Sequence, residues 1–204
     1  MNLPNKLTLL RILIVPVMII LFYIPWLKEN YLFSYEIDGH IHGVTWLYFI
    51  ELLLFAIASI TDLLDGKIAR SRGLVTNFGK FADPLADKIL VFSAMALLML
   101  DGSGLLPKGP LVPLWVFVVM LIREFAVSGL RMIAARKGET IAAGKAGKWK
   151  TAVTMVAIIV LFLGGLHDAV IYAGQVLIYI SAILTIISGV EYFIKGKDFL
   201  KESE

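Results

Sequence analysis

The sequence predicts an all-α integral membrane protein with six transmembrane helices. Two observations support this fold class. Apolar residues make up 59% of the 204 residues and charged residues only 17%, whereas soluble domains carry about 25% charged residues. The apolar residues also fall in runs close to the about 20 residues that cross the hydrocarbon of a bilayer. Composition therefore excludes an ordinary soluble domain and predicts one membrane domain over residues 1–204.

Six apolar stretches are long enough to be spans, and each is expected to form one helix. The predicted spans are about 9–27, 46–70, 82–100, 111–136, 149–166 and 170–194. The segment Met1–Leu10 is expected to be a short interfacial helix that leads into the first span. We expect the first span to be retained, because Arg11 interrupts its start and Ile24-Pro25-Trp26-Leu27 offers no small-residue cleavage site.

The distribution of positive charge predicts the orientation in the membrane. Among the 19 Lys and Arg residues, only Lys28 and Lys108 fall on one side, Arg123 lies inside the fourth span, and the others gather on the opposite side. The positive-inside rule makes the rich side cytoplasmic. We therefore expect a multi-pass protein of the cell membrane with both termini in the cytoplasm.

The stretch from Lys28 to Thr45 is expected to be a polar outer loop. It contains Asp38, His40 and His42, an alternation that can bind zinc. Zinc sites need three or four ligands, so solvated side chains are the favoured interpretation here. The same interpretation applies to His167 and Asp168 in the last outer turn.

Four aspartates stand at the cytoplasmic ends of two adjacent predicted spans, at helical spacing. Asp62 and Asp65 lie on one face of the second span, and Asp83 and Asp87 are one turn apart on the third. Carboxylates in an apolar setting cost about 2.5–3.5 kcal/mol each, and metal ions would compensate them. Oxygen-only ligands favour Mg²⁺ or Mn²⁺, and four carboxylates can hold two ions. The alternative is a solvated network with neighbouring Lys and Arg residues.

Small residues stand in register with these acids, which favours a binding site over a surface network. Glycine lacks a Cβ, so Gly66 and Gly79 let a bulky ligand approach the helix backbone. We expect the third span to begin only after Gly79, which would place Pro84 near its first turn.

The complete pattern, D-x2-D-G-x2-A-R-x8-G-x3-D-x3-D from Asp62 to Asp87, resembles the signature of the CDP-alcohol phosphatidyltransferase family at every fixed position. The resemblance implies a six-helix membrane fold, usually a homodimer, with a polar cavity open to the cytoplasm. It also implies site roles. Metal ligands would be Asp62, Asp65, Asp83 and Asp87, with Asp87 also the base, and the CDP site would contain Asp62, Gly66, Ala69, Arg70 and Gly79.

Two further stretches, Ile122–Arg131 and Ala142–Thr151, resemble the branch of the family that uses sn-glycerol 3-phosphate as acceptor, as does the opening Leu3–Arg11. One departure is Thr154, where that branch is expected to have Gln. Arginine grips a phosphate with two parallel hydrogen bonds and lysine adds point charge. The expected acceptor-phosphate residues are Arg123, Arg131, Lys145, Lys148 and Lys150, and possible cavity-lining residues are Asn5, Thr8 and Arg11.

Several of these basic residues also have a structural interpretation. Arg123, deep in the fourth span, would be costly if unpaired, so the alternative to substrate contact is an internal ion pair with Glu124 or another acid. For Arg131, Lys145, Lys148 and Lys150, topology alone would explain a positive charge.

The activity that the resemblance implies is metal-dependent transfer of a phosphatidyl group from CDP-diacylglycerol to sn-glycerol 3-phosphate, with release of CMP. The expected partners are these two substrates, the lipid bilayer and a second copy of the chain, and nucleic acid is not expected. A related enzyme with phosphatidylglycerol, serine or inositol as acceptor is a second hypothesis, disfavoured by the basic stretch from Arg123 to Lys150. A cation transporter is a third, since intramembrane carboxylates often mark ion pathways, but no repeated half with broken helices is found.

Overall fold

The computed structural model describes residues 2–37, 40–71, 76–100, 110–136, 138–139 and 144–200. Within these ranges the description leaves out the side chains of residues 3, 37, 40, 63–71, 77, 78, 80, 81, 145 and 198–200. The described chain is mostly helical, as predicted. Its helices are α1 (Leu3–Phe22), α2 (Pro25–Glu29), α3 (Trp46–Ser71), α4 (Asn77–Leu100), α5 (Leu114–Arg136), α6 (Lys145–Phe162), the 3₁₀ helix η1 (Gly164–Leu166) and α7 (Asp168–Leu200).

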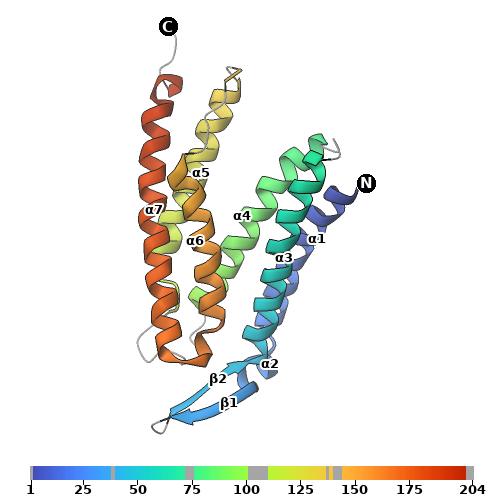
Figure 1. Cartoon of the computed structure of the whole chain (residues 1–204), viewed down its shortest axis with the longest axis vertical. Helices are drawn as coiled ribbons and strands as arrows, with labels where there is room; N and C mark the ends of the chain where they lie inside the picture. Colours follow the sequence, from blue (N-terminus) through green and yellow to red (C-terminus); the bar gives the residue numbers. More distant parts are fainter. Residues whose placement is uncertain are drawn as a thin grey trace.

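The six long helices form two groups of three, which lie side by side and diverge toward one end (Figure 1). In the first group α1 packs against α3 and α4, and in the second α7 packs against α5 and α6. Helix α1 begins and α7 ends at the diverging end (Figure 1). The two ends of the described bundle therefore lie on the same side, as an even number of antiparallel helices requires.

The first helix differs from the prediction at both ends. Asn2 caps α1 by accepting a hydrogen bond from the Asn5 backbone N–H at 3.2 Å, so the helix begins near the terminus and the predicted interfacial helix is continuous with the first span. At the other end α1 stops at Phe22 and not near residue 27. Pro25 explains the stop, because a residue before proline avoids helical angles and Ile24 is extended.

Helix α4 begins earlier than expected and contains Pro84 in its interior. The helix starts at Asn77, so Pro84 lies seven residues further on, in the helix interior. The expectation of a proline near the first turn was therefore wrong. Proline has no N–H to donate to the carbonyl four residues earlier. The helix tolerates this loss at a position where Pro84 is exposed and borders the cavity described below.

The predicted outer loop contains a β-hairpin, which was not anticipated. Strand β1 (Tyr31–Ile37) pairs with β2 (His40–Thr45) in an antiparallel ladder that runs from Tyr31 opposite Thr45 to Ile37 opposite His40. The Asp38-Gly39 dipeptide between two runs rich in aromatic and β-branched residues is a common hairpin signal, and it could have indicated this element.

The hairpin joins the two helix groups at the end where they converge. The carbonyl oxygen of Gly43 in β2 lies so close to Gly165 in η1 that a Cβ there would overlap it. On the bundle side of this contact, Phe162 of α6 packs against Tyr48 and Phe55 of α3, with ring centroids 6.1 and 6.4 Å apart. The hydrophobic core therefore lies mainly in the half of the bundle nearer the hairpin.

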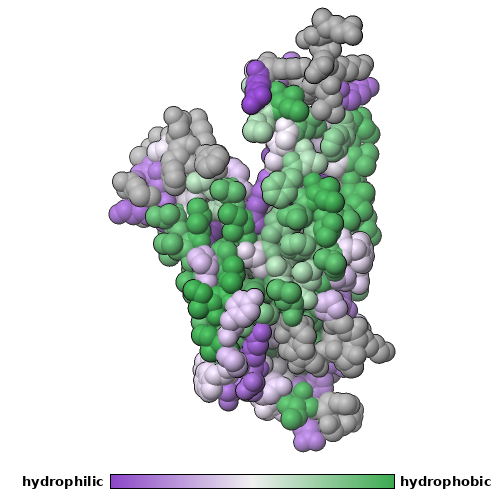
Figure 2. Space-filling view, turned by 180° about the vertical axis from the view of Figure 1, so that it is seen from behind, coloured by the Kyte–Doolittle hydropathy of each residue, from purple (hydrophilic) through white to green (hydrophobic). Residues whose placement is uncertain are grey.

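The described helices suit a bilayer by composition and surface. Two of them, over Pro4–Phe22 and Asp168–Lys197, are long and apolar enough to cross a membrane. The other expected spans stay predictions. Helices α4 and α5 carry charged residues of the candidate site, and some side chains of α3 and α6 are not described. Large apolar residues cover the outside of the bundle, and hydrophilic ones gather at its ends and in the notch between the two groups (Figure 2).

Candidate active site

Two of the predicted metal ligands meet at one arginine. Arg11, fully buried on α1, places Nη1 2.8 Å from Oδ1 of Asp62 on α3 and also donates to Oδ1 of Asp87 on α4. Both carboxylates are partly accessible, with side chains 25% and 38% exposed. Helix α1 therefore supplies a positive charge between acids that come from two other helices.

The third described acid of the signature is also held by α1. Thr8, one turn before Arg11, donates to Oδ1 of Asp83 and also to the Pro4 carbonyl at 3.1 Å. Asn5 accepts a hydrogen bond from Thr76 at 2.9 Å. Thr8 and Arg11 of α1 thus contact the acids, and Asn5 contacts Thr76 just before α4. These three residues, named above as possible cavity lining, are buried and do not belong to the described lining of the cavity below.

Gly79 is placed where a larger residue would crowd its neighbours. A Cβ at this position would lie 3.2 Å from Asn5 Oδ1 and 3.3 Å from Thr76 Oγ1, which is tighter than ordinary contacts. Asp83 Oδ2 would be 3.6 Å away. The glycine therefore allows α4 to approach the polar face of α1 beside the acids.

The donor set fits a hard divalent cation by its chemistry, since Asp62, Asp83 and Asp87 offer only carboxylate oxygens. Within the described residues, however, no group of three or more His, Cys, Asp or Glu side chains surrounds a single point as metal ligands do. The Asp65 side chain is outside the described part. The metal site of the sequence analysis thus stays a prediction, supported by two acids that share one cationic partner.

A cavity of about 240 Å³ lies where the two helix groups meet. Acidic residues of the first group, Asp62 and Asp87, border it on one side, and Lys150 and Glu124 of the second group border it on the other. Residues from α3, α4, α5 and α6 line the cavity: Asp62, Pro84, Asp87, Lys88, Val91, Phe92, Met120, Glu124, Lys150, Thr151, Thr154 and Met155. One wall therefore carries two of the signature acids, and Lys150 lies beside Glu124 on the other.

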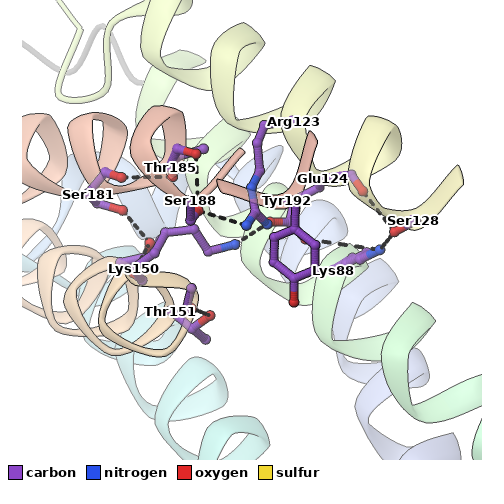
Figure 3. A network of polar contacts seen from close by, with 12 residues as sticks. Lys88, Arg123, Glu124, Ser128, Lys150, Thr151, Ser181, Thr185, Ser188 and Tyr192 are labelled. Carbon is purple, nitrogen blue, oxygen red and sulfur yellow. Dashed lines mark hydrogen bonds and ion pairs between the residues drawn. The ribbon is translucent and has the colours of Figure 1, made fainter. Parts of the chain in front are cut away.

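Glu124 on α5 lies at the centre of a cluster of three cations, Lys88, Arg123 and Lys150 (Figure 3). Its Oε1 accepts from Lys150 Nζ and, at 2.7 Å, from Arg123 Nη1. Lys88 Nζ lies 4.0 Å from Oε2 and donates to Ser128 Oγ. The internal Arg123–Glu124 ion pair, left open as an alternative above, is thus present, and Lys88 joins the same cluster.

Polar residues of α7 lie beside this cluster (Figure 3). Ser188 Oγ accepts from Arg123 Nη2 at 2.7 Å, and Ser181 shares a hydrogen bond with Thr154 of α6. The supporting residues lie on one face of α7 at helical spacing: Ser181, Thr185, Ser188 and Tyr192. That spacing within an apolar run was a signal that sequence reasoning missed.

The two predicted acceptor arginines meet at Tyr192. The guanidinium of Arg123 lies 5.5 Å from the ring centroid and that of Arg131 lies 5.0 Å away. Arg131 Nη2 also donates to the Tyr192 hydroxyl. Neither arginine belongs to the described lining of the 240 Å³ cavity, whereas Lys150 does.

Other predicted site residues are placed away from the cavity or outside the description. Lys148 is exposed on α6 and does not belong to the described lining. The structure describes no side-chain environment for Asp65, Gly66, Ala69, Arg70 and Lys145.

The structure describes only some of the histidines and aspartates that the sequence analysis named in the outer loop and the last outer turn. His42 stacks on Tyr35 and on His167, with ring centroids 5.8 Å apart in both pairs, and its Nδ1 lies 3.8 Å from Asp168 Oδ1. Asp38 and the His40 side chain lie outside the described residues. Among those described, the histidines form no three-ligand metal group.

A helical bundle with acids and cations around one cavity suits anionic substrates, and comparison with known proteins shows its family. The family model of the CDP-alcohol phosphatidyltransferases matches residues 1–187. The chain belongs to the CDP-alcohol phosphatidyltransferase family, as the signature from Asp62 to Asp87 predicted.

Relatives from several bacteria carry names for one activity. A CDP-diacylglycerol--glycerol-3-phosphate 3-phosphatidyltransferase of Bacillus subtilis is 38% identical over 99% of this chain and 98% of its own length. A protein of the same name from Rickettsia typhi is 39% identical over 94% and 95%. A probable phosphatidylglycerophosphate synthase of Mycobacterium tuberculosis is 38% identical over 94% of this chain and 79% of its own length.

Proposed function

We propose that this protein is a phosphatidylglycerophosphate synthase, which transfers the phosphatidyl group of CDP-diacylglycerol to sn-glycerol 3-phosphate. The 1-hydroxyl oxygen of glycerol 3-phosphate forms a bond to the phosphorus that carries diacylglycerol. The pyrophosphate bond to the cytidylyl group breaks, and CMP leaves. The products are phosphatidylglycerophosphate and CMP, a step of phospholipid biosynthesis.

The observation that carries this proposal is the cavity between the two helix groups. Asp62 and Asp87 line it from α3 and α4, and Lys88 and Lys150 line it from α4 and α6. A transfer between two phosphate-bearing substrates needs a site for a pyrophosphate and a site for a second anion. The relatives named above, similar over 94% or more of this chain, carry the names of this reaction.

The signature residues would bind the donor and accept the proton of the acceptor hydroxyl. Asp62, Asp65, Asp83 and Asp87 would hold Mg²⁺ or Mn²⁺, in the expected number of two ions. Bound divalent metal would neutralise the pyrophosphate and stabilise charge on the leaving CMP. Asp87, which reaches the cavity, is the proposed base for the acceptor hydroxyl. Gly66, Ala69, Arg70 and Gly79 would complete the CDP site.

The residues of α1 would orient these acids. Thr8 donates to Asp83, and Arg11 forms an ion pair with Asp62 and donates to Asp87, so each described acid of the signature has a partner on α1. Side chains held by such partners keep their positions better than free ones. We infer that α1 keeps the acids in the arrangement that the donor requires.

We further propose a six-span topology with both termini and the cavity mouth on the cytoplasmic side. The six long helices, the shared end of α1 and α7 (Figure 1) and the concentration of Lys and Arg near that end support this orientation. A homodimer remains the expected assembly, on the resemblance alone.

An acceptor screen tests the proposed function. Purified protein in detergent is given CDP-diacylglycerol and Mg²⁺, and CMP release is measured with glycerol 3-phosphate, glycerol, serine, inositol or phosphatidylglycerol. CMP release that depends on glycerol 3-phosphate is expected. Release only with another acceptor would assign a different synthase, and absence of product with every acceptor would favour a non-enzymatic role such as ion transport.

A further inference from the structure

We propose that a band of aromatic side chains at the joined end of the bundle docks into the head-group region of the lipid bilayer, which makes the β-hairpin a membrane-interface element. The aromatic band consists of Tyr23, which ends α1, Trp26 of α2, and Tyr31, Phe33 and Tyr35 of β1, and all five are exposed. A solvated polar loop was expected here. This inference goes beyond the proposed function, since it concerns the end of the bundle away from the candidate active site and needs only that α1 crosses the bilayer.

The first argument is that the aromatic band continues the outer face of α1. Exposed residues at helical spacing, Leu13, Val17 and Ile20, form an aliphatic stripe along a helix that is long and apolar enough to cross a membrane. Tyr23 follows one turn later, and Trp26 lies just beyond the end of this helix. Aliphatic side chains suit acyl chains, whereas Tyr and Trp gather where the hydrocarbon meets the head groups. The change from one kind to the other places that boundary at the end of α1.

The second argument is the difference in cover between the two strands of the hairpin, which lies across the joined end of the helices (Figure 1). Val44 of β2 is 2% exposed, whereas Phe33, its partner on β1, is 44% exposed. His42 of β2 stacks on His167 beside η1, and its partner Tyr35 is 38% exposed. Paired residues of an antiparallel ladder lie on the same face of the sheet. The face that packs on the bundle through β2 is therefore open along β1, where it is turned toward the bilayer around the helices.

The free edge of β1 sets the depth of the hairpin. The described sheet has two strands, so β1 pairs with β2 along one edge and presents backbone N–H and C=O groups along the other. Hydrocarbon offers these groups no hydrogen-bond partner, whereas water among the head groups does. The hairpin therefore lies in the head-group layer, with the rings of the aromatic band directed toward the hydrocarbon.

Charge indicates that ring contact, and not attraction to anionic lipid, holds this surface. The segment from Tyr23 to Tyr35 carries one cation, Lys28, and one acid, Glu29, so it has no net charge. Tyr and Trp instead combine an apolar body with a polar tip that can form hydrogen bonds at the interface. Docking should therefore be equally strong on neutral and on anionic bilayers.

Spin labelling of the full chain in lipid vesicles tests the docking. The chain contains no cysteine, so each variant can carry a single nitroxide label. Phe33→Cys and Tyr35→Cys place the label on the aromatic band, and Ser34→Cys and Glu36→Cys, exposed neighbours on the other face of β1, are the matched controls. In phosphatidylcholine vesicles the band labels should collide several-fold less often with a water-soluble nickel complex than the control labels, and more often with oxygen, which concentrates in hydrocarbon. The same pattern should appear in vesicles that contain phosphatidylglycerol.

A second set of variants shows whether the rings themselves hold the hairpin at the bilayer. With the label at Tyr31→Cys, the combined change Phe33→Ser and Tyr35→Ser should raise collisions with the nickel complex toward the level of the Glu36→Cys control. The matched control is Ile41→Ser. Ile41 is an exposed apolar residue opposite Glu36, on the face turned away from the bilayer, so this change should leave the label as it was. Circular dichroism in vesicles checks that each variant is folded, and a label unmoved by the double change would overturn the role of the rings.

Other outcomes would overturn the docking itself. Equal collision frequencies at the band and control labels would place the hairpin in water. Spin–spin broadening between band labels of two chains would show that a second copy covers the aromatic band. A difference that appears only in vesicles with anionic lipid would replace ring contact by charge. Each measurement is made without substrate, so its result is independent of CMP release and of the proposed function.

Discussion

Arg11 Nη1 lies 2.8 Å from Asp62 Oδ1, which links the N-terminal helix to the signature acids. The same guanidinium donates to Asp87 on α4. Helix α1 therefore contributes to the proposed active site, although the family signature itself begins only at Asp62.

Replacement of Arg11 should destabilise the protein. Arg11→Met removes the cation between Asp62 and Asp87 and should lower the free energy of unfolding by about 1.5–3 kcal/mol, the scale of a charged hydrogen bond. Arg11→Lys should recover part of this loss, because it restores a charge without the planar fork. Thermal unfolding in detergent measures both. Equal melting temperatures for wild type and Arg11→Met would show that the ion pairs contribute nothing to stability.

Asp87→Asn should abolish turnover in a folded protein. The amide keeps the shape of the side chain but loses its negative charge and its ability to accept the proton, so the rate of CMP release should fall by at least about 10²-fold. Asp168→Asn, with 59% of the Asp168 side chain exposed at the start of α7, is the control and should remain active. Near-normal turnover in Asp87→Asn would remove this residue from the chemistry.

Removal of divalent metal by chelation should inactivate the enzyme. EDTA is expected to stop CMP release, and Mg²⁺ or Mn²⁺ should restore it, since the candidate ligands offer only hard oxygen donors. Addition of either ion should also raise the melting temperature of the chelated protein, because a ligand that binds only the native state stabilises it. Full activity after exhaustive chelation would contradict the metal site.

Two glycine substitutions should have opposite effects on stability. Gly165→Ala places a Cβ against the Gly43 carbonyl and should cost about 1–3 kcal/mol, as overpacking does. Gly129→Ala is the matched comparison, because a Cβ there meets no atom within 4 Å. It lies within α5 and should stabilise the helix by about 0.4–1 kcal/mol. Melting temperatures of the two variants test the prediction, and a neutral Gly165→Ala would mean that the hairpin contact can shift at no cost.

The long helices and the acidic wall could be predicted because their signals are local. Apolar length indicated the helices, and the spacing of Asp62, Asp83 and Asp87 placed them on helix faces that the structure brings to Arg11 and Thr8 of α1. The cluster of cations around Glu124 was only partly predictable. Lys150 was expected at the acceptor, but the pairing of Lys88 with Ser128 joins residues 40 positions apart, which no local periodicity encodes.

Other differences have local causes that competed with the stronger apolar signal. Pro25 ended α1 early although the apolar run continued to Leu27. The hairpin was overlooked because its strands are short and the histidines drew attention to solvated or metal-binding interpretations. In α7, small hydroxyl residues such as Ser188 barely lower the hydrophobicity of the run, so their common face was hidden in an otherwise apolar helix.

The contact between Gly43 and Gly165 joins the two helix groups at one end of the bundle, so that a small rotation there would separate their other ends. The two helix groups are joined at the hairpin end and diverge at the other (Figure 1). Helix α4, with 24 residues, is a rigid arm about 36 Å long at a rise of about 1.5 Å per residue. A rotation of about 5° at the joined end would move the far end of such an arm by about 3 Å. Widening the cavity mouth for a lipid head group would thus require only a small rotation near the hairpin, where Phe162 packs against Tyr48 and Phe55.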